Sequence, residues 1–209
     1  METIQRSKDV TEYLMTGAEL RSSDPKEGPQ RLFGYAAVFD SFSETMHDFA
    51  GPFREKIMRG AFAKPLAEKQ DVVALINHDG LPIGRTVNGT LRLAEDDYGL
   101  LAEIDIPDTT DARDLMTLVR RKDVFQMSFA FRVAEGGDKW ESTPDGDVRF
   151  VTGLSNLYDV SAVTRPAYVK SKIEAAGINS RSRTEWLQSR RPQPIVRLNR
   201  HRLELARRK

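Results

Sequence analysis

The chain has 209 residues with no cysteine and three histidines, and its 32 Lys and Arg almost balance its 31 Asp and Glu, for a formal net charge of +1. This length predicts one domain with appendages at most, and a hydrophobic fraction of 39% with ten Phe is enough for a core, which excludes wholesale disorder. Without cysteine there are no disulfides, thiolate zinc sites or cysteine nucleophile. No apolar run approaches the roughly 18 residues of a membrane span, and the first residues lack the apolar region of a secretory signal. We therefore expect an intracellular protein with no membrane partner.

The charge is unevenly distributed along the chain. Residues 179–209 hold ten Arg and Lys against two Glu, a net charge of +8, which leaves −7 for the other 178 residues. Apolar periodicity also fades near residue 176. These shifts predict a folded domain over 1–176 and a basic, flexible tail over 177–209. Clustered basic residues can bind nucleic acid, but the body is acidic and has no interleaved aromatic and basic face, so nucleic acid is not an expected partner.

Most of the body is predicted to be β-structure. Period-two alternation indicates eight strands, at 11–20, 31–40, 71–77, 90–95, 98–106, 125–133, 148–154 and 157–163. Two helices are predicted, a short one at 60–69 that contains Pro65 and a stronger one at 110–121. In the second helix Ala112, Leu115, Met116 and Val119 share one face, and Asp108, Thr109 and Asp111 provide capping groups and negative charge at its start. This pattern is typical of a mainly β protein, a barrel or sandwich decorated by a few helices.

The predicted strand at 125–133 carries the first candidate for chemistry. Its alternation places one set of side chains toward the core, namely Phe125, Met127, Phe129, Phe131 and Val133. The opposite, open face would carry Gln126, Ser128, Ala130 and Arg132. Ser128 is therefore a small hydroxyl on a well-anchored strand, which is a good platform for a nucleophile because the rate depends on precise positioning. An ordinary hydrogen-bonded surface serine fits the same pattern.

The candidate base is His78, where the apolar strand at 71–77 ends and a loop begins. Histidine titrates near neutral pH, so it can take and return a proton. His47, in a polar loop, is a rival base, and His201 in the basic tail is a weaker one. A loop histidine that only bonds its neighbours is the alternative for His78.

A serine nucleophile also needs a carboxylate that orients its base. Asp159 is the candidate, because an acid within an otherwise apolar strand must be paired to be tolerated. Asp79 is a rival, although neighbours along an extended chain, such as His78 and Asp79, point in opposite directions. An edge-strand aspartate facing water is the alternative for Asp159.

The chain resembles a known family, the prohead (capsid maturation) serine proteases of tailed bacteriophages, whose fold is similar to that of the herpesvirus assemblins. The resemblance covers about residues 11–170 and rests on the order of several segments more than on any one of them. These segments are GYAAVFDSFSE from Gly34, FREKIMRGAF from Phe53, VALINHDGLPIGRT from Val73, GLLAEIDIPDT from Gly99, the helix DLMTLVRR, FQMSFAFRV around Ser128, and LYDVSAVTRPAY from Leu157.

The resemblance implies roles for individual residues. It places the nucleophile on Ser128, the general base on His78 and the third member on Asp159, where assemblins use a second histidine. By a looser analogy Arg165, through its backbone N–H or its guanidinium, is a candidate for the oxyanion hole. The resemblance implies a closed or partly closed β-barrel decorated by helices, with no cofactor and no metal.

The function implied is that of a serine endopeptidase in procapsid maturation. Its expected substrates are the scaffold protein or the scaffolding segment of the major capsid protein, with the chain itself as a further candidate, inside the assembling procapsid in the cytoplasm of the bacterial host. A homodimer is expected only by analogy with assemblins. The alternatives are an inactive assembly factor of the same fold and a nucleic-acid-binding module that uses the basic tail. The tail could instead dock to an acidic scaffold or capsid surface, or be a solvated terminus without a partner.

Overall fold

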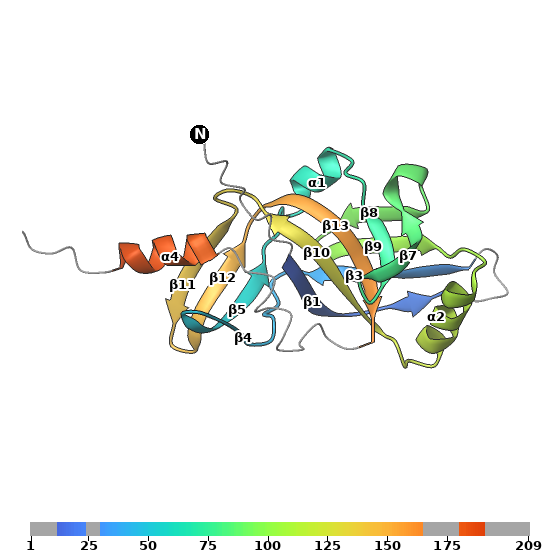
Figure 1. Cartoon of the computed structure of the whole chain (residues 1–209), viewed down its shortest axis with the longest axis horizontal. Helices are drawn as coiled ribbons and strands as arrows, with labels where there is room; N and C mark the ends of the chain where they lie inside the picture. The colour runs from blue at the N-terminus through green and yellow to red at the C-terminus, as the bar shows by residue number, and fades with distance from the viewer. Residues whose placement is uncertain (1–11, 24–29, 165–179, 191–209) are drawn as a thin grey trace, which may run out of the picture.

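A computed structural model describes residues 12–23, 30–164 and 180–190 (Figure 1). Within these residues the chain is mainly β, with three sheets and few helices. The first sheet has the order β1 (Glu12–Glu19), β10 (Gln126–Val133), β13 (Leu154–Val163), β6 (Val73–Ile76) and β7 (Asp79–Arg85). The second sheet has the order β11 (Asp138–Thr143), β12 (Gly146–Val151), β5 (Gly51–Ile57) and β4 (Met46–Asp48). The third sheet has the order β2 (Arg21–Ser22), β3 (Arg31–Val38), β9 (Gly99–Asp105) and β8 (Leu91–Glu95). The described helices are α1 (Ala63–Ala67), the short 3₁₀ turn η1 (Thr86–Asn88), α2 (Thr110–Arg120) and α4 (Ser180–Ser189).

The mainly β class predicted from the sequence is confirmed, but the barrel is not. Each of the three sheets is open in the described residues and ends in two edge strands. All eight predicted strand regions contain a strand. The prediction missed the two-residue β2 as well as β4, β5, β7 and β11. In β7 the glycines Gly80 and Gly84 and the proline Pro82 break the apolar alternation, and in β5 a buried acid, Glu55, stands where an apolar residue was expected.

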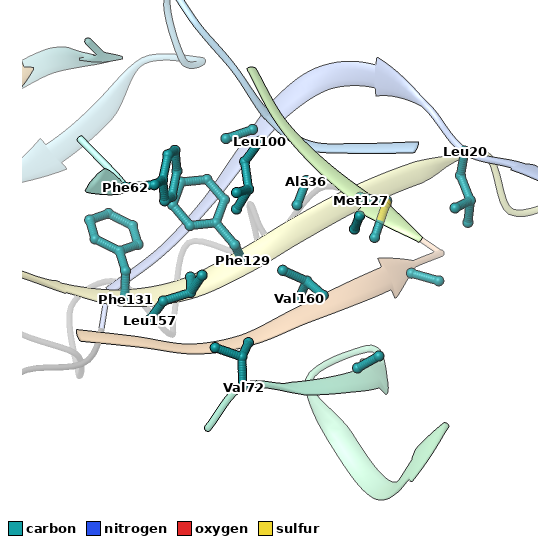
Figure 2. Close-up of a cluster of buried hydrophobic side chains, with 14 of the residues drawn as sticks. Leu20, Ala36, Phe62, Val72, Leu100, Met127, Phe129, Phe131, Leu157 and Val160 are labelled. Carbon is teal, nitrogen blue, oxygen red and sulfur yellow. The ribbon is translucent and has the colours of Figure 1, made fainter. Parts of the chain in front are cut away.

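The hydrophobic core forms where β10 meets the third sheet. Figure 2 shows Met127, Phe129 and Phe131 of β10 beside Phe62, Ala36 and Leu100. The ring of Phe129 lies 5.4 Å from that of Phe62 and 4.8 Å from that of Phe131. Each such aromatic side chain contributes about 1.5–3 kcal/mol by burial, so β10 is held firmly by its core face.

Two predictions about β10 were wrong. Phe125 is 46% exposed and lies outside the core, because the strand begins only at Gln126. Ser128 is fully buried and does not lie on an open face. β10 is an interior strand with β1 on one side and β13 on the other, and its residues 127–131 are buried on both faces.

Helix α2 follows the predicted pattern closely. Its buried residues are the four predicted ones, Ala112, Leu115, Met116 and Val119. Its start differs from the prediction: Thr109 is the N-cap residue by backbone geometry but makes no side-chain capping bond, and Asp108 pairs with Arg113. The periodicity therefore predicted the packing face correctly, whereas the capping chemistry depended on side-chain rotamers.

Helix α4 lies within the segment predicted to be a tail. In Figure 1 it runs beside β11 of the second sheet. Its Arg183 is buried and ion-paired with Asp48 and Asp147 of that sheet. Residues 180–190 thus pack against the body, and the division of the chain at residue 176 stays a prediction.

Candidate active site

The register of the first sheet determines which residues surround Ser128. In the antiparallel pair of β10 and β13, Ser128 lies opposite Ser161 and Ala130 lies opposite Asp159. Paired residues project from the same face of a sheet, and so do residues two apart on a strand. Ser128, Ser161 and Asp159 therefore share one face, opposite the face on which Phe129 packs into the core.

His78 is presented to this site by a tight hairpin turn. Ile76 of β6 pairs with Asp79 of β7, so Asn77 and His78 are the two turn residues, and both have positive φ, 54° and 59°. Such values are those of a type I′ turn, the favoured two-residue link between antiparallel strands. Positive φ is uncommon in non-glycine residues, and asparagine and histidine adopt it more often than most. The sequence analysis placed His78 at a strand end but did not detect this turn.

The turn is attached to β13, the strand that carries Asp159. The Asn77 backbone N–H donates to the carbonyl of Ala162 at 2.9 Å. The Asn77 side-chain oxygen accepts from the backbone N–H of Thr164, also at 2.9 Å. These two bonds hold the backbone of His78 at a set position along β13.

His78 and Asp159 are in direct contact. His78 Nδ1 lies 2.6 Å from Asp159 Oδ1, and both side chains are largely buried, with 13% and 9% exposed. A buried carboxylate requires such partners. With Asp159 ionised, Nδ1 carries the proton, which leaves Nε2 as the basic nitrogen of the ring. Asp159 lies on an interior strand, not at an edge facing water.

Ser161 is a member of this cluster that the sequence analysis missed. Its hydroxyl donates to Asp159 Oδ1 at 2.7 Å, and the residue is fully buried. Its signal in the sequence was its spacing, because a hydroxyl two residues after Asp159 must lie on the same face of the strand. Nothing in the sequence showed that this face would be buried.

The rival candidates lie elsewhere or lie outside the described residues. His47 is exposed on β4, in the second sheet. Asp79 is exposed, and its carboxylate accepts from the backbone N–H of Gly80 at 2.8 Å. Arg165 and His201 lie outside the described residues. Among the residues described, no cluster of His, Asp and Glu is suited to hold a metal ion, and no helix is long and apolar enough to cross a membrane.

The fold and this face define a mainly β protein in which a histidine contacts an aspartate on the sheet face that also carries a serine, the three residue types of a serine-hydrolase triad. The family model of the caudovirus prohead serine proteases matches residues 16–187, so the chain belongs to this family, as the resemblance predicted. Membership of this family places the chain in the class of serine proteases. Neither the curated proteins nor the solved structures give a significant match.

Proposed function

We propose that the chain is a serine endopeptidase of procapsid maturation in which Ser128 is the nucleophile, His78 the general base and Asp159 the residue that orients it. The observation that carries this proposal is the 2.6 Å contact between His78 Nδ1 and Asp159 Oδ1 on the face that also bears Ser128. Family membership supports the class of reaction, and the geometry supports the assignment of these three residues.

The proposed reaction proceeds through an acyl-enzyme. Ser128 Oγ attacks the peptide carbonyl while its proton moves to His78 Nε2, and the imidazolium then donates this proton to the leaving amine. Water repeats the same steps to release the acid. Asp159 remains ionised throughout and stabilises the imidazolium from the Nδ1 side. An oxyanion donor, for which Arg165 is the candidate, would contribute about 2.7–4 kcal/mol to the barrier reduction.

The proposed substrates are the scaffold protein or the scaffolding segment of the major capsid protein, and the chain itself. The proposed place of action is the assembling procapsid in the host cytoplasm. The family's description as a prohead protease supports both proposals.

One observation bears on how the activity would be controlled. Ser128 is fully buried, so the groups that cover it must move before a peptide carbonyl can reach its hydroxyl. We therefore propose that the described state is latent. The same burial favours the second candidate function, an assembly factor of this fold that cleaves nothing.

Co-expression with the capsid protein of the same genome distinguishes the two. Intact-mass analysis should show trimmed capsid or scaffold protein with the wild-type chain and none with Ser128→Ala. Ser155→Ala is a matched control, because Ser155 lies on β13 but its hydroxyl donates to the backbone carbonyl of Arg132; trimming should continue. Unchanged trimming with Ser128→Ala would rule out Ser128 as the nucleophile, and no trimming with the wild type would favour the assembly factor.

A further inference from the structure

Asp159 Oδ1 accepts two hydrogen bonds, one from His78 Nδ1 at 2.6 Å and one from the Ser161 hydroxyl at 2.7 Å. We propose that Ser161 is a positioning residue of the site, whose hydroxyl holds the Asp159 carboxylate in the orientation that His78 requires. The proposal rests on the proposed function, since it assigns Ser161 a part in the same reaction.

A carboxylate on its own is poorly fixed. The terminal torsion of an aspartate is broad, so one hydrogen bond to His78 leaves the plane of the Asp159 carboxylate free to rock. A second donor on the same oxygen restricts that motion. The bonds to an ionised acceptor are also stronger than neutral ones, and burial of both residues removes water as a competing donor.

Ser161 is well placed for this role because its backbone is fixed on both sides. It lies opposite Ser128 of β10 and opposite Leu75 of β6, so it occupies the middle of a three-strand row. The residue is fully buried, which leaves rotation of the hydroxyl as its main freedom. That rotation is set by the bond to Asp159.

The same geometry separates the roles of the two serines. The Ser161 proton is directed to a carboxylate oxygen and not to a ring nitrogen of His78. Ser161 therefore acts through Asp159, and Ser128 remains the proposed nucleophile. A fluorophosphonate probe should consequently label Ser128 in a Ser161→Ala protein, although more slowly.

The test compares three substitutions at Ser161 with the control Ser155→Ala. Ser161→Ala removes the hydroxyl, Ser161→Cys keeps the volume with only a weak donor, and Ser161→Thr keeps the hydroxyl. On a peptide spanning a mapped cleavage site, we expect kcat to fall roughly 10- to 100-fold for Ala and Cys, as for other misplaced catalytic groups. KM should stay within about twofold because Ser161 is not proposed to touch substrate. Ser161→Thr should keep most of the wild-type kcat.

A spectroscopic readout makes the test independent of turnover. The Nδ1–H of His78 should give a deshielded proton NMR signal, assigned by its loss in His78→Asn. We expect Ser161→Ala to shift or broaden this signal and Ser155→Ala to leave it unchanged.

The outcomes that overturn the proposal are specific. The proposal is overturned if Ser161→Ala keeps the wild-type kcat and an unchanged Nδ1–H signal. It is also overturned if a folded Ser161→Thr protein is as slow as Ser161→Ala. If Thr does not fold, a Cys variant with wild-type kcat would overturn it. If the wild type neither trims capsid protein nor reacts with the probe, the proposed function fails, and the NMR comparison still decides whether Ser161 positions Asp159.

Discussion

His78 has a backbone conformation that few non-glycine residues adopt, with φ at 59° in a two-residue turn. An L-residue in this region carries a cost of roughly 1–2 kcal/mol. The bonds from Asn77 to β13 and the contact of the ring with Asp159 offset that cost. Such outliers are often found at functional sites, where the local cost is part of how a side chain is presented.

The strain at His78 can be measured by comparing two inactive variants. His78→Asn should be about 1 kcal/mol more stable than His78→Ala, because asparagine tolerates positive φ and alanine does not. Both lose the imidazole, so the loss of the contact with Asp159 is common to both. Urea unfolding of the two proteins checks this, and equal free energies of unfolding would show that the turn carries no strain.

Substitution of Asp159 should lower kcat far more than substitution of its rival Asp79. Asp159→Asn keeps the shape of the side chain but favours the wrong imidazole tautomer, so kcat should fall by about 10³- to 10⁴-fold, as for comparable changes in serine protease triads. Asp79→Asn alters an exposed acid directly beside His78 in the chain and should leave kcat within about threefold. The rate of peptide cleavage by both variants provides the comparison. A large loss in Asp79→Asn with normal activity in Asp159→Asn would reverse the assignment.

At the scale of elements, one deeply buried side chain anchors α4 on the second sheet. Arg183 lies between Asp48 and Asp147, at 2.6 and 2.7 Å, and over the rings of Phe53 and Trp140, at 5.0 and 4.8 Å. These four partners come from β4, β12, β5 and β11, so every strand of that sheet contributes one. Trp186 adds a ring contact with Trp140.

Substitution of Arg183 should release α4. A helix of ten residues is marginal in isolation, so without its anchor the amides of residues 180–190 should exchange at nearly unstructured rates. Arg183→Lys should lose the hydrogen-exchange protection of α4 almost as fully as Arg183→Ala. Lysine cannot bond both acids through one planar group, nor stack on the aromatic rings as a guanidinium does. Hydrogen exchange measured by mass spectrometry checks this. Gln188→Ala, at an exposed position of the same helix, should keep its protection; equal protection in Arg183→Ala would show that other contacts hold the helix.

This anchor also changes how the tail should be tested. Removing residues 179–209 would delete Arg183 and leave Asp48 and Asp147 without it, so a defect could reflect an altered body. Truncation after Arg190 keeps α4 and removes most of the basic charge. We propose that residues 191–209 dock to an acidic scaffold or capsid surface, and normal entry of this shorter chain into procapsids would contradict that proposal.

At the scale of the whole molecule, a buried charge cluster joins the first sheet to the second. Arg149 of β12 is completely buried and pairs with Glu55 of β5 and Asp138 of β11, each at 2.7 Å, and with Glu12 of β1. β1 also pairs with β10 next to Ser128. The cluster therefore links the strand beside the site to the sheet that holds α4.

This cluster should make stability depend on pH. Burial, partly offset by Arg149, raises the pKa of Glu55 to about 7 from an ordinary value of 4.5. The folded state then holds a proton that the unfolded state releases, so the stability contributed by Glu55 falls as pH rises from about 4.5 to about 7 and is constant above. The full loss is on the order of 3 kcal/mol.

Glu55→Gln removes this titration. We expect its free energy of unfolding, relative to the wild type, to be greater at pH 8 than at pH 5, as measured by urea unfolding at both values. Glu141→Gln changes an exposed glutamate on β11. Its free energy of unfolding should change between the two pH values as that of the wild type does. A constant difference between Glu55→Gln and wild type across this range would show that Glu55 is not protonated in the fold.

Local pattern was sufficient where a residue's neighbours lie on its own strand or helix. The apolar face of α2 and most of the core stripe of β10 followed directly from spacing. Pattern failed at Phe125 and Ser128, because alternation states which residues share a face but not where the strand begins or what covers that face. It also missed β5, where Glu55 is buried and pairs with Arg149 of the neighbouring strand.

The sequence by itself determined the class: an acidic, mainly β body with an ordered set of segments that belongs to the prohead serine protease family. Only the tertiary structure decided that Asp159 contacts His78, that Ser161 shares the same oxygen, and that Arg183 ties part of the basic segment to the body. The physical reason is that these contacts join residues distant along the chain. Their distances depend on strand order and register, which packing of the whole chain sets and no local period encodes.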